Sequence, residues 1–407
     1  MRMDITRRSL IAAAATATAA CTTTPPASGR SYDAVVVGAG VFGAWTATHL
    51  KRAGKRVLLV DQMGPANARA SSGGESRMTR AAYGRDAIYS RMAHASLREW
   101  VALSRRSALP LFHQVGVLFF FDEMVDYARD SIAVHEELGL PLEQLDQAAL
   151  QRRWPQIDFS GVAFGMYEPE FGALMARRAV QELVTRFAAS GGDYRLAHAE
   201  PGADGHSVRL DSETLNADAI VYACGPWLPK VFPELLGQRI FVTRQEIAFI
   251  APPDGDDRFE GVALPGWADF NGGDLYYGFP NLEARGFKLA RDTHGGTFDP
   301  DSGDRRMSEA GMALLRSFVA RRFPALAERP FSEFRVCQYE NSSNGDFLID
   351  RHPTHDGVFL LGGGSGHGFK HGPEVGRLMA DLVLHGREPD PRFSLATKAT
   401  VHDRSVI

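Results

Sequence analysis

Three glycines near the start of the chain have the spacing G-x-G-x-x-G, which suits a turn that holds a dinucleotide. Gly38 permits a tight turn, Gly40 lets the backbone approach a pyrophosphate, and Gly43 lets a helix pack closely on a strand. Asp61 lies further along, where an acidic residue receives a ribose hydroxyl. This carboxylate favours FAD or NAD over NADP, because it would repel a 2′-phosphate. We therefore expect a dinucleotide-binding site here rather than a glycine-rich turn without a ligand.

The residues around these glycines predict the elements that the motif requires. Residues 33–37 and 57–60 are short apolar runs typical of buried parallel strands, and residues 44–53 indicate a helix between them. Val41 and Phe42 lie inside the motif, so we include them among the cofactor-binding residues. A helix N-terminus offers N–H groups and partial positive charge to phosphates. The complete strand–turn–helix–strand unit makes the glycine spacing specific.

A second glycine-rich turn, residues 362–368, follows an apolar strand pattern at 358–361 and precedes a helix expected from Pro373 onward. Its N–H groups can face another electron-rich part of a ligand, such as N1 and the C2 carbonyl of a flavin. The alternative is a mobile glycine loop. His367 can either cap the backbone or act on the ligand. The residues of this turn assigned to the cofactor are Gly364, Gly366, His367 and Gly368.

The composition limits the class of protein. The chain has 407 residues, 44% of them hydrophobic and 23% charged, which predicts a globular protein with two lobes. A net charge of −4 without a long basic run gives no support for nucleic-acid binding. No stretch of about 20 apolar residues predicts a membrane-spanning helix. The three cysteines, Cys21, Cys224 and Cys337, cannot form a disulfide framework, and no Cys/His cluster has metal-ligand spacing. We take Cys224 as a packed strand residue.

The first 30 residues have the layout of an export signal. Arginines precede an apolar run at residues 10–20, and residues 6–11, TRRSLI, resemble the twin-arginine signal that carries folded proteins. Residues 18–21, TAAC, resemble a lipoprotein cleavage site, so a lipid anchor at Cys21 and simple cleavage are both open. We expect a periplasmic protein or a membrane-anchored lipoprotein. The alternative is an N-terminal extension without a targeting role.

Five stretches, spread over nearly the whole chain after this leader, resemble one known family. They are VVVGAGVFGAWTATHL, GGESRMTRAAYG, YYGFPNLEARGFKLA, VCQYENSSNGDFLIDRHP and GSGHGFKHGPEVG. The chain resembles the monomeric sarcosine oxidase and N-methyltryptophan oxidase family, FAD-dependent amine oxidases of the D-amino-acid oxidase superfamily. The last two stretches are specific, whereas the first is shared with many flavoproteins. The resemblance implies an α/β fold. It combines a glutathione-reductase-type FAD-binding domain with a second, mostly antiparallel-sheet α+β substrate domain.

The predicted elements alternate between these two domains along the chain. Helical spacing appears at residues 173–190 and 307–323, and strand patterns appear at 217–224, 240–250, 275–279 and 287–290. We assign residues 1–30 to the leader and tether, 31–90, 155–238 and 331–388 to the FAD-binding domain, 91–154 and 239–330 to the substrate domain, and 389–407 to a C-terminal tail.

The resemblance assigns cofactor chemistry to three side chains. Cys337 stands where the family attaches its flavin through sulfur to the 8α-methyl group. Lys288 matches the lysine that activates oxygen in this family. A fixed cation beside the flavin can do this by stabilising superoxide. Arg77 matches an arginine next to the flavin. Without the resemblance, Cys337 would be an inert buried thiol and the two cations would be solvated charges or surface ion pairs.

The resemblance also assigns the substrate side of the site. Arg80 and Lys370 match the pair that grips a substrate carboxylate, and the planar fork of arginine binds a carboxylate through two hydrogen bonds. Lys370 follows the second glycine turn, so it can also reach the cofactor. Tyr277 and Tyr339 match tyrosines near the substrate. Surface ion pairs for the cations and aromatic packing for the tyrosines are the alternatives.

Three positions depart from the family pattern. Ser72 and Gly73 stand where the family often has histidines, one of which supports flavin attachment, so the covalent link at Cys337 loses a helper. Asp292 stands four residues after Lys288, where the family has histidine. This carboxylate changes the charge near the oxygen-activating lysine and can change the range of substrates.

The resemblance implies an FAD-dependent oxidase of secondary amino acids, either N-methyl or cyclic. The amine becomes an imine, and O2 becomes hydrogen peroxide. Sarcosine, N-methyltryptophan, pipecolate, proline-like amines and glycated amino acids all fit a carboxylate clamp. A second hypothesis is an exported D-amino-acid or amine dehydrogenase that passes electrons to a quinone or cytochrome. A third is a non-catalytic flavin-binding protein such as a redox sensor.

Overall fold

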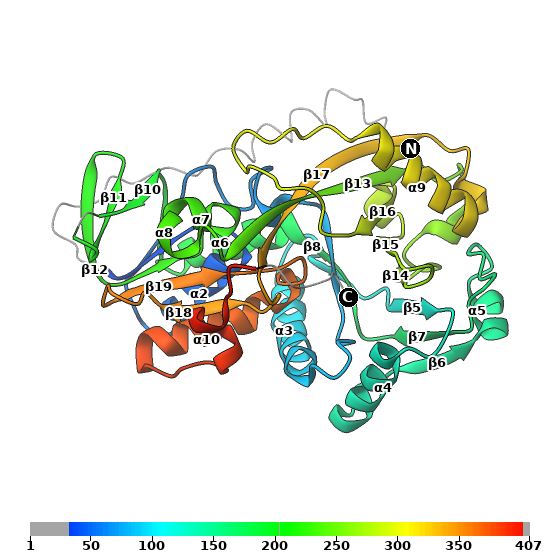
Figure 1. Ribbon diagram of the computed structural model, residues 1–407, viewed down its shortest axis with the longest axis horizontal. Coiled ribbons are helices and arrows are strands. Elements are labelled where there is room, and N and C mark those ends of the chain that lie inside the picture. Colours follow the sequence, from blue (N-terminus) through cyan, green and yellow to red (C-terminus); the bar gives the residue numbers. More distant parts are fainter. Residues whose placement is uncertain (1–31, 203, 402–407) are drawn as a thin grey trace, which may run out of the picture.

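The first glycine motif follows the central strand of a mixed sheet, drawn on the left of Figure 1. The structure, a computed structural model, describes residues 32–202 and 204–401. The strands of this sheet are, in spatial order, β10 (Ala199–Pro201), β11 (Ser207–Leu210), β12 (Glu213–Tyr222), β1 (Tyr32–Val37), β2 (Val57–Asp61) and β9 (Asp193–Leu196), with β19 (Val358–Gly362) beside β12 and β18 (Leu348–Arg351) beside β19. Five of them, β19, β12, β1, β2 and β9, run parallel. Both glycine turns therefore follow parallel strands of the same sheet.

The apolar side chains of β1 point alternately to the two faces of this sheet and pack into a hydrophobic core on each. Ala34 and Val36 pack on one face and Val35 and Val37 on the other, because successive side chains of a strand point to opposite sides. The first face is covered by α2 (Val41–Arg52), α3 (Ala87–Arg105), α6 (Ala176–Ala189) and α10 (Gly372–His385), and the second by α7 (Leu228–Val231) and α8 (Pro233–Leu236). Helices on both faces make β1 a fully buried strand.

A second sheet occupies the right side of Figure 1. Its strands are, in spatial order, β17 (Phe331–Ser342), β13 (Ile240–Ile250), β16 (Phe287–Asp292), β15 (Leu275–Phe279), β14 (Gly266–Asp269), β5 (Val117–Phe121), β7 (Phe164–Glu168) and β6 (Glu143–Asp146). All neighbours are antiparallel except β14 and β5. α9 (Glu309–Arg322) packs against it, where Phe318 stacks on Trp267 and Tyr276 at 5.6 and 4.1 Å between ring centroids.

A small sheet joins segments that precede and follow the first strands of the second sheet. β8 (Gly172–Met175) pairs with both β3 (Ser76–Thr79) and β4 (Phe112–His113). α4 (Asp126–Leu138) and α5 (Gln147–Arg153) complete the longer helices. β3 matters for the site because it contains Arg77 and ends directly before Arg80, two of the predicted site residues.

The predicted fold class is confirmed, and the main elements occur where their patterns indicate them. β13 and β15 have the predicted bounds, 240–250 and 275–279. α2 begins earlier than predicted, at Val41, because the residues between the motif glycines are already helical. The apolar pattern alone places this helix at residues 44–53, since the glycines interrupt its first turn.

Two strands and one helix pack with a different sheet from the one that the predicted domain ranges indicate. β7 and β17 fall in ranges assigned to the FAD-binding domain, yet both pair within the second sheet. β17 pairs with β13 from Ile240↔Ser342 to Ile250↔Phe331. α3, most of which falls in the predicted substrate domain, packs with α10 on the first sheet. A strand's partner depends on long-range register, which a local apolar pattern does not encode.

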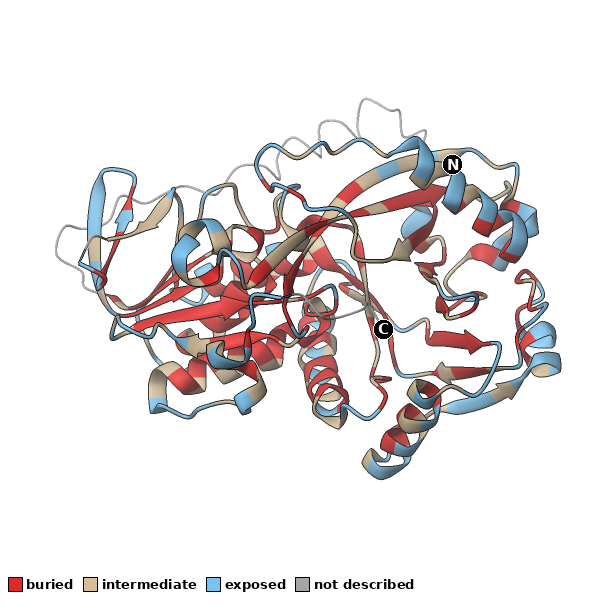
Figure 2. Cartoon of the chain, viewed as in Figure 1, coloured by how far each residue is buried: buried red, intermediate tan, exposed pale blue. Residues whose placement is uncertain are grey.

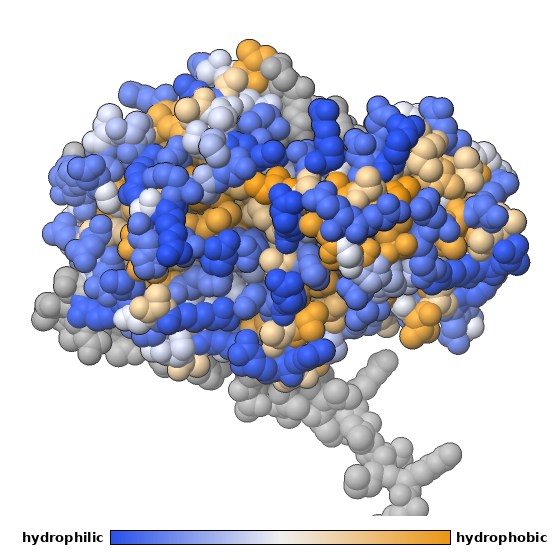
Figure 3. All heavy atoms as spheres, turned by 90° about the horizontal axis from the view of Figure 1, so that it is seen from below, coloured by the Kyte–Doolittle hydropathy of each residue, from blue (hydrophilic) through white to orange (hydrophobic). Residues whose placement is uncertain are grey.

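Burial follows the sheets and the inner helix faces (Figure 2). The face of the molecule in Figure 3 is covered mainly by hydrophilic side chains, with hydrophobic residues between them. Among the described residues, no helix combines the length and the apolar composition that a bilayer crossing requires. The predicted leader, with Cys21, lies outside the described residues. The predicted tail docks on the first core through Phe393, which is buried.

Candidate active site

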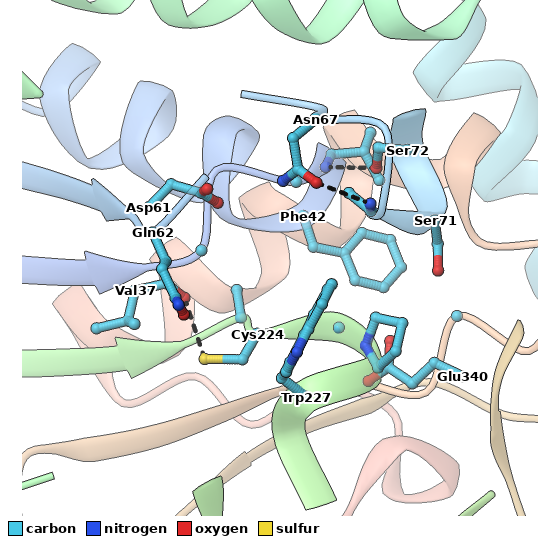
Figure 4. Close-up of a pocket in the computed structure, with 18 of the residues that line it drawn as sticks. Val37, Phe42, Asp61, Gln62, Asn67, Ser71, Ser72, Cys224, Trp227 and Glu340 are labelled. Atoms are coloured by element: carbon cyan, nitrogen blue, oxygen red, sulfur yellow. Dashed lines mark hydrogen bonds between the residues drawn. The ribbon is translucent and has the colours of Figure 1, made fainter. Parts of the chain in front are cut away.

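A cavity of about 730 Å³ runs between the two glycine turns and the end of the second sheet (Figure 4). A pocket of this size is in the range that holds a large organic ligand. Of the residues expected at the cofactor, most line it: Gly38, Gly40, Val41, Phe42, Asp61, Arg77, Cys337, Gly364, Gly366 and Gly368. Tyr339, expected near the substrate, also lines it. Segments more than 300 residues apart thus form one site, as the two-turn prediction requires.

The first glycine turn has the close packing that its sequence predicts. Gly38 has φ +106°, and a Cβ atom there would collide with the carbonyl oxygen of Ala223. A Cβ atom on Gly43 would collide with the carbonyl oxygen of Gly38. At Gly40 the nearest atom to an added methyl group would be Ser72 Oγ at 3.6 Å, so this side of the turn opens on the cavity. These residues fit the pyrophosphate of a dinucleotide such as FAD.

Asp61 ties the end of β2 to the first glycine turn. Its Oδ2 accepts a hydrogen bond from the N–H of Ala39 at 2.8 Å, and Oδ1 accepts from Met63 and Gly64 at 2.9 and 2.8 Å. Burial raises the pKa of Asp61, while these three N–H groups act to lower it. The carboxyl group is therefore fixed at the cavity wall, at the predicted position for a ribose hydroxyl.

Cys337 lies where the large cavity meets a small one of about 30 Å³. Arg77 Nη2 is 3.5 Å from Cys337 Sγ and also donates to the carbonyl oxygen of Ser71 at 2.6 Å. Lys288 and Gly73 line the small cavity together with Cys337. The structure thus brings together the predicted attachment cysteine, flavin arginine and oxygen-activating lysine.

The two departures before β3 have structural roles of their own. Ser72 Oγ accepts a hydrogen bond from the N–H of Val41 at 3.1 Å, at the first turn of α2. The carbonyl oxygen of Gly73 accepts from Arg177 Nη2 at 2.6 Å, and a Cβ atom on Gly73 would collide with the carbonyl oxygen of Asn67. The loop that faces Cys337 is therefore held by the Ser72 hydroxyl and by the backbone of Gly73.

Lys288 is a buried cation, only 2% exposed. Its Nζ donates to the carbonyl oxygen of Ser76 at 2.7 Å and lies 5.1 Å from the ring centroid of Phe279. Burial lowers the pKa of Lys288 well below its usual range, and Arg77 lowers it further. The alternative of a solvated surface lysine is wrong. A lysine with these surroundings is a functional-site candidate.

Arg80 and Lys370 meet at the ring of Tyr83. The Arg80 guanidinium lies 4.1 Å and the Lys370 ammonium 5.3 Å from its centroid. Lys370 Nζ donates to Tyr83 Oη and to the carbonyl oxygen of His367, both at 2.8 Å. Lys370 is 5% exposed, so the surface ion-pair alternative does not describe it. Tyr83 is a site residue that the sequence did not indicate, although it lies three residues after Arg80.

Further aromatic and imidazole groups hold this pair. Tyr127 Oη lies 3.3 Å from Arg80 Nη1, and His371 Nε2 lies 2.7 Å from Tyr83 Oη. His371 is fully buried, and burial together with Lys370 lowers its pKa well below the usual range. Although burial lowers the pKa of Arg80, Tyr127 and the other nearby groups raise it overall, so Arg80 stays charged. The two cations are thus held in a mostly buried position by hydrogen bonds and aromatic contacts.

Tyr277 and Tyr339 form a hydrogen-bonded pair next to Asp292. Tyr339 Oη donates to Asp292 Oδ1 at 2.8 Å and is also hydrogen bonded to Tyr277. Burial and then Asp292 raise the pKa of both tyrosines, so both stay neutral. Asp292 also interacts electrostatically with Arg80. The carboxylate that replaces the family's histidine therefore lies inside the group of predicted substrate residues.

His367 binds the backbone and an aromatic side chain at the same time. Its Nε2 lies 3.1 Å from the carbonyl oxygen of Gly345, and its Nδ1 lies 3.3 Å from Tyr83 Oη. A carbonyl oxygen only accepts, so Nε2 carries the proton. In the neutral ring Nδ1 then accepts from Tyr83. His367 thus connects the second glycine turn to Tyr83, the tyrosine whose ring Arg80 and Lys370 contact.

The cavity wall also contains residues that were not predicted from the sequence, among them Trp227 and Glu340. Trp227 donates through Nε1 to Asp301 Oδ1 at 2.7 Å, and Glu340 follows Tyr339 on β17. The expected strand residue Cys224 lines the cavity too, with Sγ 3.7 Å from the carbonyl oxygen of Val37. The sequence Gly-Pro-Trp shortly after β12 could have indicated Trp227 as a cavity residue. Ligands bind beside the carboxyl ends of the strands of a parallel sheet.

The glycine turns, the cavity and the buried cations define an FAD-dependent oxidoreductase. The sequence profile described as "DAO: FAD dependent oxidoreductase" matches residues 33–382, and the chain belongs to this family. It is similar to the monomeric sarcosine oxidase of Streptomyces avermitilis, with 30% identity over 371 residues, 89% of this chain and 96% of the relative. It is also similar to the N-methyl-L-tryptophan oxidase of Citrobacter koseri, with 29% identity over 88% of this chain and 96% of the relative.

Solved structures agree on the fold. NikD, an amino acid oxidase essential for nikkomycin biosynthesis, has a TM-score of 0.73 at 24% identity and covers 93% of this chain and 98% of its own. The L-proline dehydrogenase of P. horikoshii has a TM-score of 0.77 at 17% identity, over 90% of this chain and 97% of its own. Both identities are low, so these structures support the two-sheet architecture alone.

Proposed function

We propose that this protein is an oxidase of secondary amino acids, N-methyl or cyclic, that reduces O2 to hydrogen peroxide. The observation that carries the proposal is the meeting of Arg80 and Lys370 at the ring of Tyr83. Two cations at one aromatic ring, with the Asp292 carboxylate interacting with Arg80, leave a net positive charge for an amino acid carboxylate. The relatives named as sarcosine and N-methyl-L-tryptophan oxidases act on amino acids that carry this group.

The charged groups of the site complement the two charged groups of an amino acid, with cations for its carboxylate and acceptors for its amine. Arg80 and Lys370 bind the carboxylate, and Arg80 offers a planar fork for it. On the other side, Asp292 and its partner Tyr339 offer acceptors for the amine N–H. An amine loses a hydride only in its unprotonated form, so the Asp292 carboxylate also serves to accept the proton of a bound ammonium. The clamp holds the substrate in one orientation.

FAD, when bound, supplies the two-electron chemistry that converts the amine to an imine and returns the electrons to O2. Gly38, Gly40 and the start of α2 would hold its pyrophosphate, and the N–H groups of the second glycine turn would favour an electron-rich part of the cofactor. Lys288 places a buried positive charge next to Cys337, where it stabilises the negative charge that O2 acquires. Water then hydrolyses the imine.

Covalent attachment of FAD through Cys337 is part of the proposal. Attachment needs a thiolate, and Arg77 and Lys288 place two positive charges near this sulfur. Acid precipitation of the purified protein tests the link. Flavin colour should stay with the denatured polypeptide and be lost to the supernatant after Cys337→Ser. Colour released from the unaltered protein would contradict attachment.

The direct test of the activity is hydrogen peroxide release from a panel of N-methyl and cyclic amino acids. We expect peroxide in amounts equal to the amine consumed. Rapid reduction by an amine followed by slow reoxidation in air would instead favour the dehydrogenase hypothesis, in which a quinone or cytochrome accepts the electrons. Activity with a D-amino acid of primary amine type would also favour it.

We further propose export by the twin-arginine-like leader, with a lipid anchor at Cys21 or cleavage beside it. Folded export suits a protein whose cofactor is enclosed between segments from both ends of the chain. Cell fractionation tests this directly. The protein should leave the cytoplasm, and replacement of Arg7 and Arg8 by lysine should retain it there. Cys21→Ala should release it from membranes if the anchor is used.

A further inference from the structure

Glu340 is a buried acidic residue that neither glycine motif accounts for. It lies on β17 next to Tyr339, lines the large cavity and is 6% exposed. Its Oε1 accepts a hydrogen bond from the N–H of Gly363 at 3.1 Å, and its carbonyl oxygen accepts from the N–H of Ser365 at 2.8 Å. Figure 4 shows Asp61 and Glu340 on opposite sides of the view, with Trp227 between them. The carboxyl group is thus fixed at the end of the cavity that the second glycine turn forms.

Burial decides the charge of this carboxyl group. It raises the pKa of Glu340 to about 8, against the N–H groups of Gly363 and Gly364, which favour the anion. At neutral pH the group is therefore mostly a carboxylic acid. Both backbone partners are donors, so they cannot receive its proton. The proton needs an acceptor, and the cavity is where a ligand can supply one.

The groups around Glu340 do not supply a positive charge that would keep it ionised. Cys224, at the end of β12, interacts with it, but burial raises the pKa of this thiol far beyond neutrality. Lys230 and Asp301 line the same cavity and pair with each other at 2.6 Å. The segment before α10 presents the backbone of Gly363 and Gly364. A charged Glu340 would stand beside an anionic cofactor without a compensating cation among these groups.

We propose that Glu340 is a neutral acid that donates a hydrogen bond to an electron-rich atom at the flavin end of FAD. Such a donor binds more strongly when the acceptor gains negative charge, so it stabilises the reduced cofactor. A carboxylate at the same place would repel it. The inference rests on the use of FAD, which the proposed function shares. It does not depend on which amine is oxidised.

The proposal predicts that reduction of FAD is coupled to the proton of Glu340. Below the pKa of the oxidised protein, the acid keeps its proton in both redox states, and nothing is added to the pH dependence. Above it, the oxidised protein has lost the proton, and reduction draws it back because the reduced cofactor favours the neutral acid. The two-electron reduction potential therefore falls more steeply with pH above the pKa that Glu340 has in the oxidised holoprotein.

The test is an anaerobic titration of the holoenzyme against redox dyes between about pH 6 and pH 10, without any amine. The unaltered protein should show an added slope of about 30 mV per pH unit above the Glu340 pKa, as one proton per two electrons requires. Glu340→Gln, which keeps a neutral donor of the same size, should lose the added slope and keep the neutral-pH potential. Glu340→Leu should lower that potential by about 30 mV, a tenfold weaker preference for reduced FAD.

A control on the same strand is Glu333→Gln, which removes a carboxylate paired with Arg285 outside the cavity and should match the unaltered protein. The proposal is overturned if Glu340→Gln keeps the added slope. It is also overturned if Glu340→Leu leaves the potential unchanged. Glu340→Gln alone decides the matter if the leucine variant does not fold. Lack of amine oxidation would defeat the proposed function and leave this titration valid, whereas a protein that binds no FAD would defeat both.

Discussion

The two ends of the cofactor cavity are built in different ways. The first end consists largely of backbone from one stretch, residues 37–63: the glycine turn, the start of α2 and the end of β2. The second end has side chains from β3 and β17 next to the glycine turn after β19, and Lys288 of β16 lines the small cavity that adjoins it. Cations are buried only sparingly in proteins, yet Lys288 and Lys370 are both buried here.

This difference separates binding from chemistry. A turn of glycines and N–H groups suits the pyrophosphate of any dinucleotide, because it recognises charge and shape common to them all. Buried ammonium groups need specific surroundings, and removing them from water costs free energy that packing must offset. We infer that the backbone end fixes the cofactor and the side-chain end decides what reacts with it. Four changes would break or sharpen this division.

The largest effect is expected from Lys288→Met. A preorganised group that stabilises developing charge contributes about 10²–10³ in rate, so reoxidation of the reduced enzyme by O2 should slow by that factor. Anaerobic reduction by substrate should change little, because the substrate clamp is intact. Stopped-flow absorbance separates the two half-reactions. Equal slowing of both would contradict a specific role with oxygen.

The charge of Lys288 also predicts a pH dependence. Its pKa lies well below the usual range, so the cation is lost as the pH rises through that lowered pKa, and reoxidation should slow. Lys288→Arg should keep its charge and show no such decline. In stability the sign is opposite: the unfolded lysine binds its proton more tightly, so the free energy of unfolding rises with pH between the folded and unfolded pKa values. A pH-independent reoxidation rate in the unaltered protein would contradict the predicted loss of the Lys288 charge.

A smaller effect is expected from Lys370→Met. Hydrogen bonds to charged groups contribute about 1.5–3 kcal/mol, so KM for an N-methyl amino acid should rise by about 10- to 100-fold while Arg80 still holds the carboxylate. Amines that lack a carboxylate should react slowly, and equally slowly with and without the Lys370 side chain, which makes them the matched control. Steady-state kinetics with both kinds of substrate measure the difference. A uniform loss with both would indicate a collapsed site.

The smallest effect concerns the backbone end. Gly43→Ala places a methyl group against the carbonyl oxygen of Gly38, and overpacking of this kind costs about 1–3 kcal/mol. FAD should be retained less well, and thermal unfolding should occur at a lower temperature. Gly296→Ala adds the same methyl group where no atom lies within 4 Å, so it is the control. Substrate preference should stay the same, since the side-chain end is unchanged.

The backbone end could be predicted from the sequence alone because its parts are neighbours in the chain. The strands around Gly38 and Gly43 are apolar runs whose order and spacing define the unit. The side-chain end could not be derived in this way. The first four residues of β16 are all buried, so no alternation marks Lys288 as special, and its partner Ser76 lies on β3. The resemblance to a known family supplied Lys288 and Arg80.

The site residues that the sequence did not indicate depend on tertiary contacts. Glu340 meets Gly363 because β17, which pairs with β13 in the second sheet, ends beside the turn after β19. The predicted domain ranges place β17 in the wrong sheet. Tyr83 matters because α10 and its preceding turn bring Lys370 and His371 to it. A local pattern does not encode these meetings, since each joins elements whose pairing depends on the whole fold.

The most direct test of the substrate clamp is flavin absorbance during anaerobic mixing with sarcosine and with dimethylamine, which is sarcosine without its carboxylate. Arg80 and Lys370 are held at one aromatic ring, so the amino acid should be oriented and should bleach the flavin band. If sarcosine is too small, N-methyltryptophan against its decarboxylated amine makes the same comparison. We predict bleaching by the carboxylate-bearing member of the pair and little by the other. Equal bleaching by both members, or none by any amino acid of this class, would contradict the clamp.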